Sequence, residues 1–168
     1  GKEVDINSPM VAKKYGIALL PEDRSREGLF IERKIKENIS APIIDTICKK
    51  GIVNRKKENE IAEKYVEELK VRTPSIETVV GTLSGGNQQK VIVARWLAND
   101  PDVLIMDEPT RGIDVGAKHE IYEIMSDLAK QGKAIIMISS EMSELLGMAD
   151  RICVMCNGKL TGEIDQPE

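Results

Sequence analysis

The feature that most constrains the fold is a pair of short apolar segments set between helical stretches in the second half of the chain. Val103–Met106 and Ala134–Ile138 contain no polar residue, whereas the stretches at about 85–98 and 115–130 have the spacing of amphipathic helices. Strands that are apolar at every position are typical of a parallel sheet covered on both faces. The alternation therefore predicts an α/β fold with a mainly parallel sheet.

The first half of the chain begins with a similar unit and then changes character. Ser8-Pro9 predicts a helix start, Gly16 predicts its end, and the apolar run Ile17–Leu20 predicts a strand. From about residue 34 to 72 the pattern is helical, and Asn54 is suited to cap one of its segments. We expect a helical insertion in this region.

The end of the chain reads as a hairpin that contains two of the cysteines. A short helix is expected at about 141–147, then a strand from Arg151, with a tight turn at Asn157-Gly158. Cys153 and Cys156 lie in this strand, where a spacing of three points the two sulfurs to opposite faces. This favours core cysteines over a metal or redox site.

Composition excludes several classes of function. A chain of 168 residues with 41% hydrophobic residues suffices for one compact domain. Its 24 basic and 28 acidic residues give a formal charge of -4, without a basic patch for nucleic acid. No apolar run approaches the ~20 residues that cross a bilayer, and the first residues lack the apolar stretch of a signal peptide. We therefore expect a soluble cytoplasmic domain whose cysteines are reduced.

Two acidic residues, Asp107 and Glu108, directly follow the apolar run Val103–Met106. The carboxyl ends of strands form the edge at which open α/β sheets bind ligands. In nucleotide hydrolysis, the first acid of such a pair can hold Mg²⁺ through a water molecule, and the second can orient or deprotonate the attacking water. Taken alone, the pair is more often a solvated strand end.

A second candidate site precedes the helix expected at 85–98. Ser84, Gly85 and Gly86, in the run LSGGNQQK, place backbone N–H groups at the positive end of a helix dipole, where an anion can bind. The two glycines allow a phosphate to approach closely. The alternative is that these residues are only a helix cap with a flexible lead-in.

The serine-glycine loop, the acidic strand and the run RGID at 111–114 occur in an order and at a spacing that resemble the ATP-binding-cassette (ABC) family. LSGGNQQK is similar to the family's signature loop, VLIMDEP to its Walker B strand, and RGID to its D-loop. Together with TPS at 73–75 and ISSEMSELLGMADR at 138–151, these runs resemble the second cassette of tandem ATPases of ribose, galactose and xylose importers.

The resemblance implies a RecA-like P-loop NTPase core plus a helical signature subdomain. This single domain would comprise a helical subdomain at about 28–82 and core parts at about 1–27 and 83–168. The family's Walker A pattern, G-x-x-x-x-G-K-[ST], does not occur in the sequence, and neither does the aromatic residue that stacks on adenine. By family comparison Gly1 falls after Walker A. We therefore expect a truncated cassette that is inactive alone and exposes apolar sheet surface.

Two positions depart from the family pattern. Glu22 stands at the position of the Q-loop glutamine, and Ser140 stands at the position of the switch histidine. A serine lacks the imidazole that exchanges protons near neutral pH, so a site built on Asp107 and Glu108 is expected to hydrolyse ATP poorly. The sole histidine, His119, is expected to be a surface residue in the helix after the D-loop.

Members of the family sandwich each ATP between the Walker A of one cassette and the signature loop of another. The resemblance therefore implies a site completed in trans for the first cassette of the same polypeptide, with Asp114 of the D-loop communicating between the two sites. ATP and Mg²⁺ are the implied cofactors, with Mg²⁺ held by Asp107 through water. The residues implied to contact ATP in trans are Ser84, Gly85, Gly86 and Asn87.

The implied partners are membrane permease subunits at the inner face of the membrane and, indirectly, a periplasmic or extracellular sugar-binding protein. The surface from Glu22 to Lys36 is the candidate permease-docking site, although its mixed charges also suit a solvated face. An ATPase half that energises sugar import is the leading hypothesis. A catalytically silent regulatory cassette is the alternative, and substitution of Ser84 separates the two. A soluble cassette acting on DNA or ribosomes is disfavoured by the acidic balance.

Overall fold

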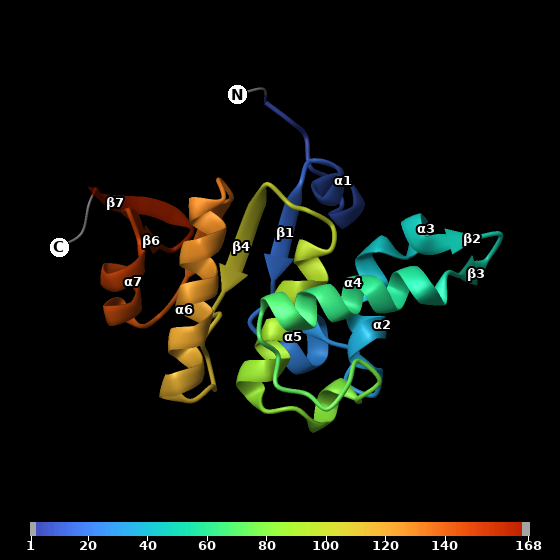
Figure 1. Cartoon of the computed structure of the whole chain (residues 1–168). Coiled ribbons are helices and arrows are strands. Elements are labelled where there is room, and N and C mark those ends of the chain that lie inside the picture. Colours follow the sequence, from blue (N-terminus) through green and yellow to red (C-terminus); the bar gives the residue numbers. More distant parts are fainter. Residues whose placement is uncertain (1–2, 166–168) are drawn as a thin grey trace.

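A computed structural model describes residues 3–165, so the placement of Gly1 after Walker A lies outside the described residues. In Figure 1, β1 and β4 lie side by side at the centre, α2, α3 and α4 lie to one side, and α7 with β6 and β7 lies to the other. The elements in chain order are α1 (Pro9–Lys14), β1 (Ile17–Leu20), a π-helical turn (Arg24–Gly28), α2 (Ile35–Ser40), a 3-10 turn (Ala41–Ile43), α3 (Ile44–Ile47), β2 (Cys48–Lys49), β3 (Ile52–Val53), α4 (Arg55–Glu68), a 3-10 turn (Val80–Thr82), α5 (Gly85–Leu97), β4 (Val103–Asp107), α6 (Val115–Lys130), β5 (Ala134–Ile138), α7 (Met142–Met148), β6 (Arg151–Cys156) and β7 (Lys159–Asp165).

Three parallel strands form the central sheet in the order β1-β4-β5. Ile17 of β1 lies opposite Val103 of β4, and Val103 lies opposite Ala134 of β5. The parallel arrangement brings the carboxyl ends of the three strands to one edge of the sheet. The prediction of an α/β fold with a mainly parallel sheet is confirmed.

The two faces of this sheet differ in burial. On one face, Leu104 and Met106 are fully buried in a core that includes the apolar residues of α5 and α6. On the other face, Leu19, Ile136 and Ile138 remain 49%, 52% and 47% exposed. The expectation that both faces are covered is therefore wrong, whereas the expected exposure of apolar sheet surface is confirmed. Apolar composition suits a strand for burial, but cover depends on the segments that pack against it.

The region between β1 and α5 is mainly helical, as predicted, and Asn54 caps α4 by accepting a hydrogen bond from the Lys57 N–H. Its middle departs from the prediction, because β2 and β3 form a short antiparallel pair. Lys50 and Gly51 make the connecting turn with φ values of 52° and 78°. Glycine adopts this left-handed conformation without steric cost. Residues 48–53 therefore form a hairpin and not part of a helix.

The C-terminal hairpin forms as predicted, with Asn157 and Gly158 at its turn. Its strands do not pair with the central sheet, and both Cys153 and Cys156 are exposed. The expectation of core cysteines is therefore wrong, because Ile152 is the only residue of Arg151–Cys156 that is buried in the described structure. Within residues 3–165, no group of three or more His, Cys, Asp and Glu side chains is arranged to hold a metal ion.

No helix in the described part of the chain is both long enough and apolar enough to span a bilayer. The helix after the D-loop carries His119 with its side chain 75% exposed, so the surface position predicted for the sole histidine is confirmed.

Candidate functional site

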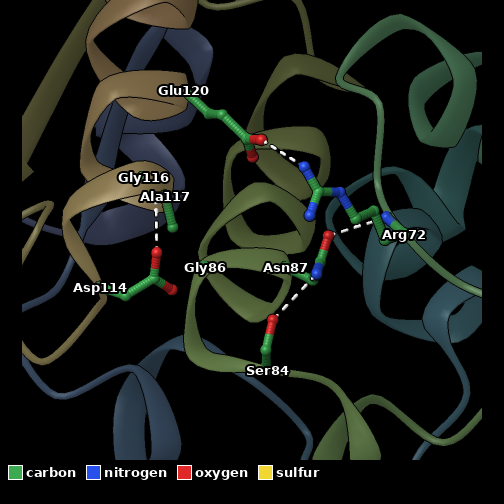
Figure 2. A pocket seen from close by; sticks show the side chains of 8 residues that line it. All are labelled: Arg72, Ser84, Gly86, Asn87, Asp114, Gly116, Ala117 and Glu120. Atoms are coloured by element: carbon green, nitrogen blue, oxygen red, sulfur yellow. Dashed lines mark hydrogen bonds and ion pairs between the residues drawn. The ribbon is translucent and has the colours of Figure 1, made fainter.

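The signature loop, residues 83–90, contains an exposed serine, Ser84, whose side chain does not cap the following helix. Ser84 occupies the residue before α5, but its hydroxyl makes no capping hydrogen bond. Instead, Asn87 Nδ2 donates to Ser84 Oγ at 2.9 Å, and Asn87 Oδ1 accepts from the Arg72 backbone N–H at 2.7 Å (Figure 2). Ser84 is thus the N-cap residue of α5, but its side chain bonds to Asn87 and makes no capping hydrogen bond.

A pocket of about 150 Å³ lies between this loop and the start of α6. It brings the predicted residues Ser84, Gly86, Asn87 and Asp114 together, although 27 positions separate Asn87 from Asp114 in the sequence. Figure 2 shows Asp114 at the first turn of α6, where its carboxylate accepts from the Ala117 N–H at 2.9 Å. The other residues that line the pocket are Arg72, Gly116, Ala117 and Glu120.

One glycine of the signature loop is needed for helix packing as well as for access. A Cβ atom on Gly85 would lie 2.9 Å from Arg24 Nη2 and 3.3 Å from the Gly112 carbonyl oxygen. A Cβ atom on Gly86 would lie only 2.5 Å from Ala117 Cβ. The Arg24 side chain can shift to relieve the contact at Gly85, whereas the contact with Ala117 Cβ means that Gly86 must be glycine for α5 to approach α6 this closely.

Gly86→Ala is accordingly expected to destabilise the domain by about 1–3 kcal/mol, because it overpacks the α5–α6 contact. Urea unfolding measures this loss, and the double variant with Ala117→Gly is expected to recover most of it. Gly147→Ala in α7 is the matched control, since its added Cβ meets nothing within 4 Å. It should be neutral or stabilise by up to about 1 kcal/mol. Equal losses at the two positions would contradict the packing argument.

The acidic pair lies at the carboxyl end of β4, apart from the signature pocket. Asp107 is the last residue of β4, and Glu108 adopts a left-handed backbone with φ 47°. The Glu108 N–H donates to the Ile138 carbonyl oxygen at 2.9 Å, and its carboxylate accepts from the Ser140 N–H at 2.8 Å. The structure thus places Glu108 beside the switch position, where the backbone of Ser140 and not its hydroxyl makes the contact.

A buried carboxylate that sequence reasoning missed joins this edge of the sheet to α6 and α7. Glu144 is 5% exposed and accepts hydrogen bonds from Thr110 Oγ1, from Tyr122 OH at 2.7 Å, from Ser139 Oγ at 2.8 Å and from Lys118 Nζ at 3.0 Å. Burial alone would raise the pKa of Glu144, but these donors lower it from 4.5 to about 2. Through Thr110 and Ser139, the network fixes the segments that follow β4 and β5, which lie next to Glu108.

The Q-loop position contacts the D-loop. Glu22 forms an ion pair with Arg111, and Arg24 donates to the carbonyl oxygens of Arg111 at 2.7 Å and Gly112 at 3.2 Å. Arg24 lies within the predicted docking surface, but its bonds to Arg111 and Gly112 were not predicted, because these residues are 87 and 88 positions away in the sequence. Lys36 is 7% exposed and pairs with Glu77, so the expected docking surface ends before Lys36.

A parallel sheet whose central strand ends in Asp107-Glu108, together with a serine-glycine helix start that shares a pocket with Asp114, defines an ATPase cassette with the P-loop NTPase α/β fold. The ABC transporter family model matches residues 2–111, more than half of the chain. The chain therefore belongs to the ABC transporter family.

Relatives with established names indicate the branch of the family. The chain is 57% identical over its whole length to the galactose/methyl galactoside import ATP-binding protein MglA of Clostridium tetani, of which it covers 34%. It is 55% identical, over 97% of its length, to the xylose import ATP-binding protein XylG of Thermoanaerobacter pseudethanolicus, of which it covers 32%. The chain thus spans about a third of the length of the curated relatives it matches.

Solved structures agree with the fold. The ADP conformation of the ABC transporter cassette MJ1267 superposes with a TM-score of 0.74 at 27% identity, covering 98% of this chain and 66% of that one. The cassette MJ0796, in a dimeric post-hydrolysis state bound to ADP and Pi, superposes with a TM-score of 0.78 at 21% identity, covering 96% of this chain and 68% of that one. At this lower identity the likeness concerns the fold alone.

Proposed function

We propose that this chain is part of an ATPase that energises monosaccharide import, and that its signature loop completes the ATP site of another cassette. The observation that carries the proposal is the open pocket beside the start of α5, in which Ser84, Gly86 and Asn87 meet Asp114 and backbone N–H groups can bind a phosphate. The names of the relatives, which are import ATP-binding proteins for galactose and xylose, support the substrate class.

In the proposed site, phosphate oxygens lie at the N-terminal end of α5, a helix of 13 residues whose dipole favours negative charge there. Ser84 donates its hydroxyl proton to the γ-phosphate, and Gly85 and Gly86 leave room for the phosphate to reach the backbone N–H groups. Asp114 caps the start of α6 beside this loop, and we propose that it communicates with the neighbouring site from there. The other cassette supplies the Walker A lysine and the switch histidine.

The acidic pair of this chain belongs to a second, weaker site in the proposal. When bound, MgATP supplies the γ-phosphoryl group for transfer to water. Asp107 would hold Mg²⁺ through a water molecule, and Glu108 would orient the attacking water. Because the Ser140 N–H already holds the Glu108 carboxylate at 2.8 Å and a serine cannot exchange protons as an imidazole does, this site turns over slowly.

The proposed partners are the first cassette of the same polypeptide, membrane permease subunits and, indirectly, a sugar-binding protein, with the chain at the inner face of the membrane. The candidate permease-docking surface is narrower than the sequence suggested. Glu22 and Arg24 bind the D-loop segment, which leaves the exposed side chains of Arg26, Phe30 and Arg33 for a partner.

Photoaffinity labelling of the complete protein tests the trans site directly. An ATP analogue with a photoreactive group on its γ-phosphate is expected to label the peptide that contains residues 84–90. Labelling of this peptide should disappear when the Walker A lysine of the other cassette is replaced by alanine. Labelling confined to peptides of the other cassette would refute the proposal and favour a regulatory cassette that contacts no nucleotide.

A further inference from the structure

The conformation of Ser84 is unusual for a serine that precedes a helix. Serine at this position normally accepts a hydrogen bond from a backbone N–H of the first turn, which contributes about 1 kcal/mol to the helix. Here Ser84 Oγ accepts from Asn87 Nδ2 at 2.9 Å instead, and no side-chain cap forms. Because a hydroxyl carries one proton, an acceptor bond of this kind leaves that proton to be donated away from Asn87.

The orientation of the Asn87 amide follows from its second contact. Asn87 Oδ1 lies 2.7 Å from the backbone nitrogen of Arg72. A backbone N–H can only donate, so the oxygen of the amide must face Arg72 and the NH₂ group must face Ser84. Asn87 therefore acts as a fixed donor toward Ser84.

Arg72 is in turn held by Glu120 of α6, which also pairs with Lys90 of α5. Its guanidinium lies 2.8 Å from Glu120 Oε1, and Lys90 Nζ lies 2.8 Å from Glu120 Oε2 (Figure 2 shows the first pair). The Lys90 side chain is 3% exposed and also donates to the Lys70 carbonyl oxygen at 3.1 Å. The hydrogen bond to Lys90 holds the pKa of Glu120 below its ordinary value, so this carboxylate stays charged at neutral pH.

We propose that Asn87 is a positioning residue, which holds the Ser84 hydroxyl off the helix cap so that its proton points to the γ-phosphate of a nucleotide bound by the other cassette. Arg72, Glu120 and Lys90 fix Asn87 in this role. The proposal rests on the proposed function and adds to it the reason why an asparagine, three residues after the serine, is part of the site. Without the donor at position 87, Ser84 turns to cap α5 and its proton no longer reaches the phosphate.

A double-mutant cycle in the complete ATPase tests this dependence. Ser84→Ala and Asn87→Ala are each expected to lower kcat at least about 10-fold, with the KM for ATP changed less than about threefold, as for a donor that acts mainly in the transition state. Because Asn87 acts through the Ser84 hydroxyl, the double variant should be no slower than Ser84→Ala. Losses that multiply would overturn the proposal.

Two further variants separate positioning from general stability. Asn87→Asp keeps the acceptor for Arg72 and places an acid in the first turn of α5, which is favourable for the helix. It is expected to fold as stably as the wild type in urea, yet to lose kcat as Asn87→Ala does. Gln88→Ala is the matched control, because Gln88 contacts the carbonyl oxygens of Val80 and Leu83 rather than Ser84. Its effect should multiply with that of Ser84→Ala.

The outcomes distinguish this inference from the function on which it rests. If Ser84→Ala leaves turnover unchanged, the trans site itself is refuted. If Ser84→Ala is slow while Asn87→Asp is as fast as the wild type, the trans site stands and the positioning role of Asn87 is refuted.

Discussion

Ser84→Arg in the complete ATPase is expected to lower ATP turnover by about 100-fold or more. The arginine side chain would occupy a pocket of about 150 Å³ and remove the hydroxyl that is proposed to meet the γ-phosphate. Loss of one donor that stabilises charge in the transition state lowers kcat by about 100- to 1,000-fold. Phosphate release under saturating MgATP measures the effect.

The matched comparison for this prediction is Glu108→Gln in the same chain. Because Ser140 stands at the switch position and Glu108 is held by its N–H, this half is proposed to contribute little turnover, and the substitution should cost less than about threefold. A large loss at Glu108 would show that this half hydrolyses ATP itself. Full activity of Ser84→Arg would instead favour a regulatory cassette.

Glu144→Ala is expected to lower the free energy of unfolding by about 3–5 kcal/mol, the range for breaking a buried, hydrogen-bonded charge network. The substitution leaves the Thr110 and Tyr122 hydroxyls without their acceptor, and it removes the buried partner of Lys118. Urea unfolding measures the loss. Glu141→Ala removes the other carboxylate that pairs with Lys118. Because the Glu141 side chain is 51% exposed, this substitution should cost less than about 1 kcal/mol. Similar losses for both variants would contradict the assigned network.

The same carboxylate predicts how stability depends on pH. Its pKa falls from 4.5 to about 2 on folding, so Glu144 stabilises the folded state by about 3 kcal/mol at pH values above 4.5. This contribution is lost as the pH falls from 4.5 through 2, because the unfolded chain takes up the proton first. The difference in unfolding free energy between the wild type and Glu144→Gln should therefore be constant above pH 5.5 and shrink toward pH 2. A difference that does not vary with pH would contradict the charged state of Glu144.

Most of the helices and strands could be predicted because they depend on patterns of residues that are close together in the sequence. Wholly apolar runs identified β4 and β5, and serine, asparagine and glycine marked helix ends at Ser8, Asn54 and Gly16. The β2-β3 pair escaped prediction because two-residue strands carry no periodicity. The open face of the sheet escaped it for a different reason: burial is a property of the neighbours of a strand, and its own residues do not encode it.

The residues of the candidate site likewise fall into those that the sequence could propose and those that it could not. Ser84, Asp107 and Glu108 lie in contiguous runs with a recognisable spacing, so the sequence alone could propose them as site residues. Arg72 and Glu144 could not be identified, because each acts through partners on other elements. The Arg72–Glu120 pair joins residues 48 positions apart, and Glu144 meets Thr110 across 34 positions. A charged residue in a loop, such as Arg72, or on a helix, such as Glu144, also suits a solvated surface. Only the packing of α5, α6 and α7 shows which charged residues have partners.

The bonds from Glu22 and Arg24 to the segment Arg111-Gly112 join two stretches of chain that are far apart in the sequence. A displacement of the surface next to Arg26 would therefore be passed to the D-loop through these side-chain bonds and not through the central sheet. Because the Glu22–Arg111 contact is an exposed ion pair, the attraction between the two side chains weakens as salt screens their charges. The contact between the Q-loop position and the D-loop therefore depends on ionic strength. A neutral glutamine in place of Glu22 would form a contact that does not.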